Sequence, residues 1–524
     1  MYLTKLMQFK NQNKRIAIIG LGAENLQFLK WLIDVVNFPT KNIILADKNT
    51  SYTVDQQLEK KLQTCTKYLG PDYLDCLSLP DLEWVVKAPG IYSLKPELSS
   101  FRQINGQDSV TSSLVFFIEK FNSKIIGITG TKGKSTTSSL LTFLLKNLLN
   151  YDVEYCGNTT GISPYLFWND LNLEIKDNNF WVIELSSFQL QDQGFCNVSP
   201  FRSVITNYYI DHQDQHRTAA EYWRAKDNIF LYSQGLLVAN SQIQGKSNLK
   251  DILKDKQVLL ISNDDVLNLS QNINFHLPGQ HNLMNLVQAL AVCANLENSK
   301  NVSLEKVQSW ITKNQVELNK ILLNFRSLPH RYQQVRAEKI PITVNEVSKQ
   351  LNLIWVDDGY ATEPDAVAAA VNSVSGKLGN YLWLWLAGFD KGSNLEVIIQ
   401  AILEKQIQSK LYSVEYCGFV GQRALTELYT SVGSSQAIGL VTLKDSMALY
   451  HQNLNQISLA FVKWLGNQLS ELKLSSQEQA FSTLNQLEEY TLHIVFSPAG
   501  SSFDEFKNAE ERATWWTDTV KKTL

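Results

Sequence analysis

The stretch GITGTKGKSTTSSLL, residues 127–141, decides the fold of this chain. The apolar run KIIGI leads into it and the helix-like STTSSLLTFLLKNLL follows, and a strand, a glycine-rich turn and a helix in that order form a phosphate cradle. In the usual loop, G-x-x-x-x-G-K-[ST], four residues separate the glycines; here two residues separate Gly130 from Gly133. The sequence predicts a shortened phosphate loop in which Lys134 neutralises the phosphates and the Ser135 hydroxyl reaches Mg²⁺, although a structural glycine-rich turn would also fit.

Strand-like and helix-like segments alternate on both sides of this loop, which is typical of α/β layers. RIAIIGLG and NIILAD read as strands before it, and FWVIELSS and RSVITNYY as strands after it. LPHRYQQV reads as a hinge into a further unit with the strands LIWVDDG, YLWLWLAGF and HIVFSPAG. We predict a Rossmann-like N-terminal domain (1–119), a central P-loop ATPase-like α/β domain (120–325) and a Rossmann-like C-terminal α/β domain (326–524). Residues 451–490, rich in Gln, Leu and Ser, read as a helical insertion.

The composition is that of a soluble globular protein, with 44% apolar and 19% charged residues. A formal net charge of −3 gives no whole-protein attraction to nucleic acid or to an anionic membrane. The six cysteines lie far apart and form no C-x-x-C pair, which indicates isolated thiols. Neither a long apolar N-terminal core nor an apolar run of about 18 residues occurs. We expect a cytoplasmic protein, taken to be a monomer, without nucleic acid or membrane partners.

Three other motifs carry candidate chemistry, and each has a structural alternative. GLGAEN (20–25) lacks the third glycine of G-x-G-x-x-G, so a turn for another ligand, or packing alone, competes with a redox dinucleotide site. Glu184 ends an apolar strand, where its carboxylate could bind a metal or form a salt bridge. YIDHQDQH (209–216) concentrates acidic and histidine side chains, which a solvated loop would also explain.

Taken together, these motifs resemble the Mur ligase family, ATP-dependent amide-forming enzymes of peptidoglycan precursor synthesis. The matching stretches are TGTKGKSTT (129–137), GNTTG (157–161), ELSSFQL (184–190), DHQDQH (211–216), YWRAKDNIF (222–230), GQHNLMN (279–285), LPHR (328–331), AGFDKGSN (387–394) and FSPAGSSFDEFKNAEERA (496–513). They keep the family's order over nearly the whole chain. ELSSFQL and SPAGSSFDEFK point to the member that adds D-glutamate to UDP-N-acetylmuramoyl-L-alanine.

The resemblance implies that ATP phosphorylates the alanine carboxylate and that the glutamate amine attacks the acyl phosphate. The implied catalytic residues are Lys134, Glu184, His212 and Lys226, the last matching a lysine that is carbamylated in the family. Two Mg²⁺ ions are implied, with Ser135, Glu184, His212 and the carbamate of Lys226 as ligands. The implied ATP contacts are Gly130, Thr131, Lys132, Gly133, Lys134, Ser135, Thr136, Asn282, Asn285, Arg331 and Asp358.

The same resemblance distributes the other substrates. Residues implied for the UDP-linked substrate are Gly20, Leu21, Gly22, Asp47, Asn158, Gln189 and His212, and those for glutamate are Thr362, Lys391 and Ser502. The family pattern D-S-K-A-T reads DGYAT here, so Tyr360 stands where a lysine is expected near the glutamate, and Ala509 stands where an aromatic residue is expected. The D or L form of the acceptor therefore stays open.

Two alternatives to this interpretation remain. A sister ligase would use another acceptor, either L-glutamate on the same nucleotide or a folylpolyglutamate-type substrate, although Asp47 and SPAGSSFDEF disfavour the folate version. A catalytically inactive homologue could persist as a nucleotide-binding regulator. The presence of Lys134, Glu184, His212 and Lys226 argues against that role.

Overall fold

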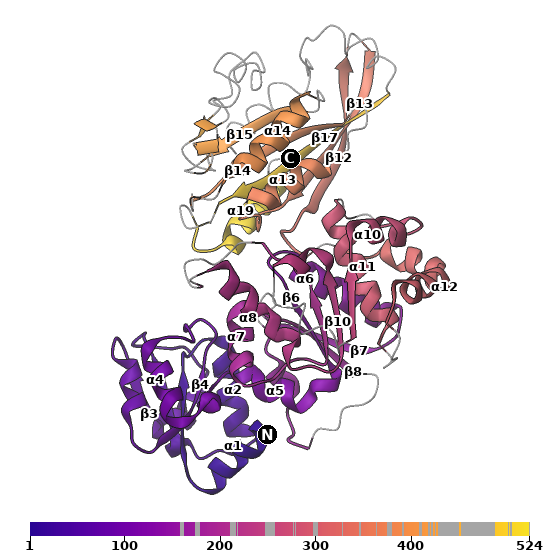
Figure 1. Cartoon of the computed structure of the whole chain (residues 1–524). Coiled ribbons are helices and arrows are strands. Elements are labelled where there is room, and N and C mark those ends of the chain that lie inside the picture. Colours follow the sequence, from indigo (N-terminus) through magenta and orange to yellow (C-terminus); the bar gives the residue numbers. More distant parts are fainter. Residues whose placement is uncertain are drawn as a thin grey trace. The chain divides into compact units, whose positions relative to one another are not determined.

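The computed structural model forms two compact units, Met1–His276 with Gln280–Phe325 and Leu277–Gly279 with Arg326–Leu524 (Figure 1). The ranges expected for three domains remain predictions. The structure describes residues 1–157, 162–172, 179–209, 216, 218–246, 257–275, 277, 279–296, 302–326, 328–344, 347–362, 364–374, 380–389, 392, 394–407, 411–417, 420, 423–424, 426–427, 450–451, 488–500, 502 and 506–522.

The first unit begins with a five-stranded parallel sheet in the order β3-β2-β1-β4-β5. Its elements are α1 (Tyr2–Asn11), β1 (Arg15–Ile19), α2 (Ala23–Asp34), β2 (Ile43–Asp47), α3 (Gln56–Lys61), β3 (Thr66–Leu69), β4 (Leu82–Lys87), α4 (Pro96–Asn105), β5 (Val110–Thr111) and α5 (Ser113–Phe121). The chain leaves β1 towards β2 on one side and later places β4 on the other. The turn after β1 therefore lies at the switch point of the sheet, where ligands of open α/β sheets bind.

A six-stranded parallel sheet follows in the same unit, in the order β11-β10-β9-β6-β8-β7. Its elements are β6 (Ile125–Thr129), α6 (Lys134–Asn147), β7 (Asp152–Gly157), β8 (Asn179–Glu184), α7 (Ser187–Phe195), β9 (Arg202–Ile205), α8 (Ala219–Leu231), β10 (Leu236–Asn240), β11 (Gln257–Ile261), α10 (Asn263–Ser270), α11 (Gln280–Ala294) and α12 (Leu304–Leu322). Because β6 lies between β8 and β9, the glycine-rich loop meets the carboxyl ends of both neighbouring strands.

One hydrophobic core runs through both sheets of the first unit. It contains Trp84 and Phe116 from the N-terminal part together with Trp168 and Trp181 from the central part. The helix α5 belongs to this core, and its residues from Leu114 to Ile118 are all buried. A helix that is apolar on every side is stable only when it is covered on every side.

The second unit holds a six-stranded sheet in the order β12-β13-β17-β14-β15-β16, in which only β12 runs antiparallel to its neighbour. Its elements are β12 (Gln333–Val344), β13 (Val347–Asp357), α13 (Pro364–Ser373), β14 (Asn380–Ala387), α14 (Glu396–Ile407), β15 (Leu411–Cys417), β16 (Tyr450–His451), β17 (Glu489–Ala499) and α19 (Ala509–Lys522).

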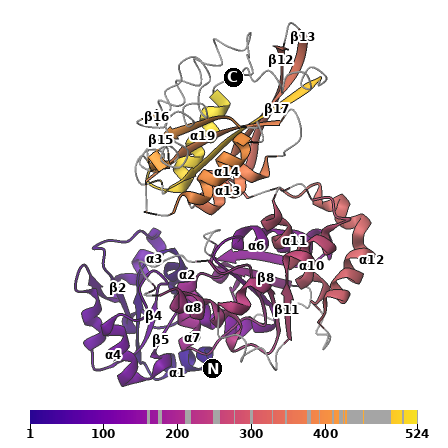
Figure 2. The same ribbon diagram turned by 45° about the horizontal axis from the view of Figure 1, so that its top comes forward.

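Alternate residues of β14 bury the two faces of this sheet. Trp383 and Trp385 pack in one cluster with Trp516 of α19, whereas Leu382 and Leu384 pack in the other with α13 and α14. This is the period of two that a strand covered on both faces requires. Figure 2, the molecule turned by 45°, shows α13 and α14 side by side.

The expected fold class, α/β layers built on parallel sheets, is confirmed by the three sheets. The expected helical insertion over 451–490 is wrong at both ends, because His451 belongs to β16 and pairs with β15, and Glu489 and Tyr490 begin β17 and pair with β13. Residues 452–487 lie outside the described part of the chain. In the described residues, no helix combines the length and apolar character needed to cross a bilayer.

Candidate active site

The glycine-rich loop leaves β6 and enters α6, with Gly133 as the N-cap residue. Gly130 and Gly133 have φ of 144° and 80°, conformations that L side chains rarely adopt. A Cβ atom on Gly133 would lie 2.5 Å from Oδ1 of Asn285, and one on Gly130 would clash with the Thr206 hydroxyl. Both positions therefore require glycine, because any Cβ atom would clash with a neighbouring side chain. The loop leads into the N-terminus of a 14-residue helix, which favours the binding of anions.

The residues after β9 hold the loop in shape. Asn207 accepts the backbone N–H of Lys132 through Oδ1 at 2.9 Å and donates from Nδ2 to the Lys132 carbonyl oxygen at 3.0 Å. The Thr206 hydroxyl donates to the same carbonyl at 2.5 Å, and the Thr131 N–H donates to the Asn207 carbonyl oxygen at 3.1 Å. The cradle is therefore organised before a ligand arrives, which lowers the entropic cost of binding.

Two lysines converge on the carbonyl oxygen of Gly130. Nζ of Lys226, from α8, donates to it at 2.8 Å, and Nζ of Lys134 donates to it at 3.1 Å. Lys226 is 2% exposed, and its Nζ lies 4.6 Å from the centroid of the Tyr222 ring. The Lys134 ammonium at the loop favours a highly charged anion such as a polyphosphate, and the buried Nζ of Lys226 lies at the same loop.

Glu184 and Ser135 are the described candidates for holding Mg²⁺. Glu184 ends β8 and is 1% exposed, and its Oε2 accepts a hydrogen bond from the Tyr155 hydroxyl at 3.1 Å. Ser135 lies in the first turn of α6 and is buried. Carboxylate and hydroxyl oxygens are the hard ligands that Mg²⁺ prefers, so both residues fit the ion. His212, expected to bind a second ion, lies outside the described residues.

Asp227 follows Lys226 in α8 and is also buried. It accepts a hydrogen bond from the Tyr208 hydroxyl at 2.7 Å. Burial raises the pKa of Asp227 to about 7 and raises the pKa of Tyr208 well above its usual value. This carboxyl group therefore changes charge near neutral pH, next to the lysine that contacts the loop.

The two asparagines expected at the adenine come from α11, which packs against α6. Asn285 is 4% exposed and lies against Gly133. Asn282 is half-buried and precedes it by three residues, which places both side chains on one face of the helix. The structure thus brings Asn285 to the phosphate loop.

The turn after β1 brings together the residues expected at the uridine diphosphate. Gly20 has a φ of 84°, and the N–H of Leu21 donates to Oδ2 of Asp47 at 2.6 Å. Oδ1 of Asp47 accepts the N–H of Asn49 at 2.8 Å. Asn25, in place of a third glycine, donates to the Gly20 carbonyl oxygen at 3.0 Å. Asp47 therefore fixes the geometry of the turn.

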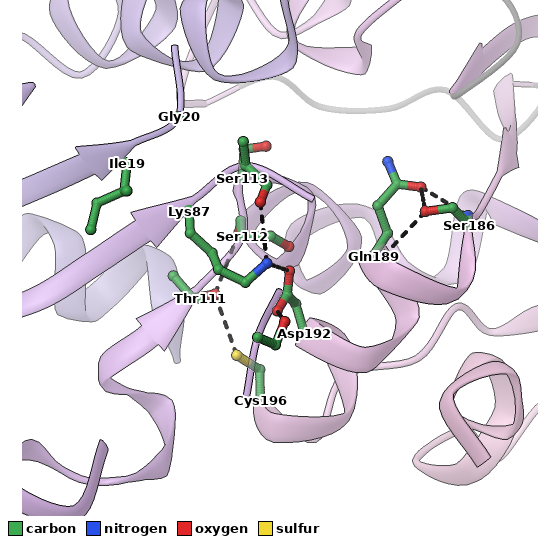
Figure 3. A network of polar contacts seen from close by, with 12 residues as sticks. Ile19, Gly20, Lys87, Thr111, Ser112, Ser113, Ser186, Gln189, Asp192 and Cys196 are labelled. Atoms are coloured by element: carbon green, nitrogen blue, oxygen red, sulfur yellow. Dashed lines mark hydrogen bonds and ion pairs between the residues drawn. The ribbon is translucent and has the colours of Figure 1, made fainter. Parts of the chain in front are cut away.

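A polar network joins the N-terminal and central parts of the first unit (Figure 3). Lys87, at the end of β4, pairs with Asp192 of α7 at 2.7 Å, and both side chains are 0% exposed. The Ser93 hydroxyl donates to the other Asp192 oxygen at 2.5 Å. A short distance along α7, Gln189 donates from Nε2 to Oε2 of Glu24 at 2.9 Å, so a second hydrogen bond spans the same junction.

In the second unit, Asp358 follows β13 and accepts hydrogen bonds from two other segments of the chain. Its carboxylate accepts the Ser497 hydroxyl at 2.8 Å and the Tyr332 N–H at 3.0 Å. Burial raises its pKa to about 7. Arg331 directly precedes Tyr332, so Asp358 anchors the chain segment that carries Arg331. Both Arg331 and Asp358 are expected to contact the nucleotide.

Tyr360 contacts the segment of Arg331. Its ring centroid lies 5.7 Å from that of His330 in a stacked arrangement and 5.5 Å from the Arg331 guanidinium. Nδ1 of His330 donates to the buried carboxylate of Asp357 at 2.7 Å, which fixes the histidine ring. The residue expected near glutamate therefore touches an arginine expected at the nucleotide.

The expected glutamate residues are only partly described. Thr362 is half-buried and Ser502 is 3% exposed. Buried Arg512 donates to the carbonyl oxygens of Gly500 at 2.9 Å and Gly359 at 3.0 Å, which ties together the segments that lead to these residues. Lys391 of this set, and Asn158 of the UDP-substrate set, lie outside the described residues.

Sequence reasoning missed Thr206, Asn207 and Tyr222, whose contacts shape the loop. The available signal was the strand RSVITNYY, because polar residues at the carboxyl end of a strand beside the phosphate-loop strand face the same edge of the sheet. Only the order of the strands shows that β9 is this neighbour. Arg512 lay inside a recognised motif, but its partners are distant in sequence.

Comparison with known proteins gives one family match and many full-length relatives. The Mur ligase middle domain model matches residues 128–271. A protein of Clostridium botulinum (strain Loch Maree) named UDP-N-acetylmuramoylalanine–D-glutamate ligase is 27% identical, covering 97% of this chain and 96% of its own. One of the same name from Acetivibrio thermocellus is 26% identical, covering 99% and 98%.

Matches among solved structures are more distant in sequence. MurC from Thermotoga maritima, a UDP-N-acetylmuramate-alanine ligase, has a TM-score of 0.46 at 15% identity and covers 98% of this chain and 100% of its own. MurF from Acinetobacter baumannii has a TM-score of 0.49 at 13% identity, covering 99% and 98%. The resemblance found in the sequence motifs is confirmed by the family match and the curated relatives.

Proposed function

We propose that this chain, whose residues 128–271 match the Mur ligase middle domain, adds D-glutamate to UDP-N-acetylmuramoyl-L-alanine at the expense of ATP. The observation that carries the proposal is the phosphate loop with Lys134 and Lys226 both on the Gly130 carbonyl oxygen. Relatives that share the name of this ligase over nearly their whole length support the choice of substrates.

The first step forms a bond between the alanine carboxylate and the γ-phosphorus of ATP, while the bond to the β–γ bridging oxygen breaks and ADP leaves. Phosphoryl transfer depends mainly on positioning and on neutralising charge. Lys134 and the helix N-terminus would hold the phosphates in line. Ser135 and Glu184 would hold Mg²⁺, which supplies further positive charge at the phosphates when bound.

The second step is attack of the glutamate amine on the acyl phosphate, with loss of a proton and release of inorganic phosphate. A buried acceptor carboxylate needs a cation or several donors. Lys391, Thr362 and Ser502 are proposed for it, and Lys226 would act as a carbamate that supplies a second anionic ligand for metal. Each of the three sets of expected residues would bind one substrate: ATP, the UDP-linked substrate or glutamate.

The test is a release assay for ADP and phosphate with UDP-N-acetylmuramoyl-L-alanine and a panel of amino acids. The expected result is turnover with D-glutamate, with product mass and chirality matching a D-glutamyl amide. An L-glutamyl product would show that the acceptor is L-glutamate, and it would not contradict the proposed ligase chemistry. Absence of nucleotide-dependent turnover with every acceptor would refute the proposal.

A further inference from the structure

The side chain of Gln189 is held in one orientation by two independent sets of contacts. Its Oε1 accepts the backbone N–H of Ser186 at 2.9 Å and the Ser186 hydroxyl at 3.0 Å, within the capping box that begins α7. Its Nε2 donates to Glu24 at 2.9 Å. Figure 3 shows the amide oxygen turned to Ser186 and the nitrogen turned away from it.

Exchanging the amide oxygen and nitrogen would be unfavourable at both ends. The amide NH₂ would then face the donor N–H of Ser186, and the amide oxygen would face the carboxylate of Glu24, so donors would meet donors and acceptors would meet acceptors. Gln189 is 3% exposed, and water therefore has little room to compensate. The orientation is set by Ser186 within α7 and by Glu24 from outside it.

Glu24 is well placed to hold this amide. It lies in the first turn of α2, directly after the glycine turn expected to bind the uridine diphosphate. Its other oxygen, Oε1, accepts the Ser113 hydroxyl at 2.7 Å, so each carboxylate oxygen has one donor. The contact to Gln189 spans 165 positions of sequence, and it links the N-terminal sheet to the helix that follows the Glu184 strand.

We propose that Glu24 is a positioning residue, which fixes the Gln189 amide so that it offers its second N–H to an oxygen acceptor of the UDP-linked substrate. The amide nitrogen carries two hydrogens, and Glu24 takes one of them. Among the described residues no contact occupies the other. The inference rests on the proposed function, in which Gln189 faces the muramoyl end, and adds that this contact is made by a donor and not by the amide oxygen.

The test compares Glu24→Ala, Glu24→Gln and the exchange variant that combines Glu24→Gln with Gln189→Glu. Glu24→Ala should raise KM for UDP-N-acetylmuramoyl-L-alanine about tenfold, the loss of one hydrogen bond of about 1.4 kcal/mol, with KM for ATP unchanged. Glu24→Gln keeps an amide oxygen that can accept the Gln189 N–H and should raise KM less. In the exchange variant, the new glutamine on α2 can donate to the new glutamate on α7 and restore the junction, so Tm should recover. The donor to the substrate stays absent, and KM should remain high.

Ser93→Ala is the matched control, because it removes a hydrogen bond to Asp192 in the same junction without contacting Glu24 or Gln189. It should lower Tm and leave KM for the UDP-linked substrate unchanged. A KM that follows Tm through all variants, or an unchanged KM in Glu24→Ala, would overturn the proposal. If the unaltered protein neither binds nor uses the UDP-linked substrate, the proposed function fails and the inference with it.

Discussion

Replacing Asp192 by asparagine should destabilise the first unit by about 3–5 kcal/mol. The Lys87–Asp192 pair has a 2.7 Å contact and no exposure on either side. Removing one partner of such a pair leaves the other charge buried and uncompensated, which costs about 3–5 kcal/mol in measured cases. The asparagine side chain would keep the shape of the aspartate and lose only the charge, so packing contributes little to the difference.

The loss of stability expected for the buried pair can be compared with that for an exposed ion pair in the same unit. Lys14 and Glu83 lie 2.8 Å apart with 35% and 48% exposure, and Glu83→Gln should cost below about 1 kcal/mol because water screens the pair. Lys87→Met with Asp192→Leu should recover most of the loss, since an apolar pair of similar volume removes both desolvation penalties.

Urea unfolding followed by tryptophan fluorescence measures these differences, because Trp84, Trp168 and Trp181 all lie in the core of the first unit. A change in midpoint without a change in slope reports stability alone. The reasoning would be refuted if Asp192→Asn lost no more than Glu83→Gln, or if the apolar double variant were less stable than Asp192→Asn.

Further predictions concern the loop and its neighbours. Gly133→Ala should raise KM for ATP at least about tenfold, because a Cβ there meets a side chain at 2.5 Å on a backbone with φ of 80°; Gly245→Ala, with open space around it, should not. Lys134→Ala should abolish most phosphate release while Tm stays within a few degrees, and an active variant would contradict the assignment. Lys226→Ala should abolish turnover, with partial restoration by bicarbonate or a short carboxylate; wild-type activity would argue against a carbamate. Since burial raises the pKa of Asp227 to about 7 from an ordinary 3.8, the folded state binds its proton more tightly, and stability from this group falls as pH rises from about 4 to 7. The Tm of Asp227→Asn minus the Tm of the unaltered protein should therefore be larger at pH 8 than at pH 5. Equal Tm differences at both pH values would contradict this.

The local features of the fold could be predicted from the sequence, because they depend on neighbouring residues. The loop at Gly130–Gly133 is predicted by the spacing of its glycines and by the strand and helix on either side. The strands around Asp47 and Glu184 follow from short apolar runs that end in a carboxylate. Both ends of the predicted insertion are wrong, because His451 and Glu489 join strands only through pairing with β15 and β13.

Long-range contacts could not be predicted in this way. Lys87 and Asp192 lie 105 positions apart, and nothing in either local sequence indicates that both are buried. Tyr360 was interpreted through the lysine it replaces, whereas its stacking on His330 and its contact with Arg331 depend on how the chain turns. Contacts of this kind become visible only when the order and register of the strands are known.

The shared core around α5 has a consequence for dividing the gene. A fragment that stops near residue 119 would cut inside the last turn of α5 and leave Phe117 without Trp168 and Trp181, against which it packs. Such a fragment would be expected to aggregate or to be degraded in the cell, because its largest apolar surface would face water. A fragment that ends after Phe325 keeps both sheets and their common core, so it is better suited to recombinant expression.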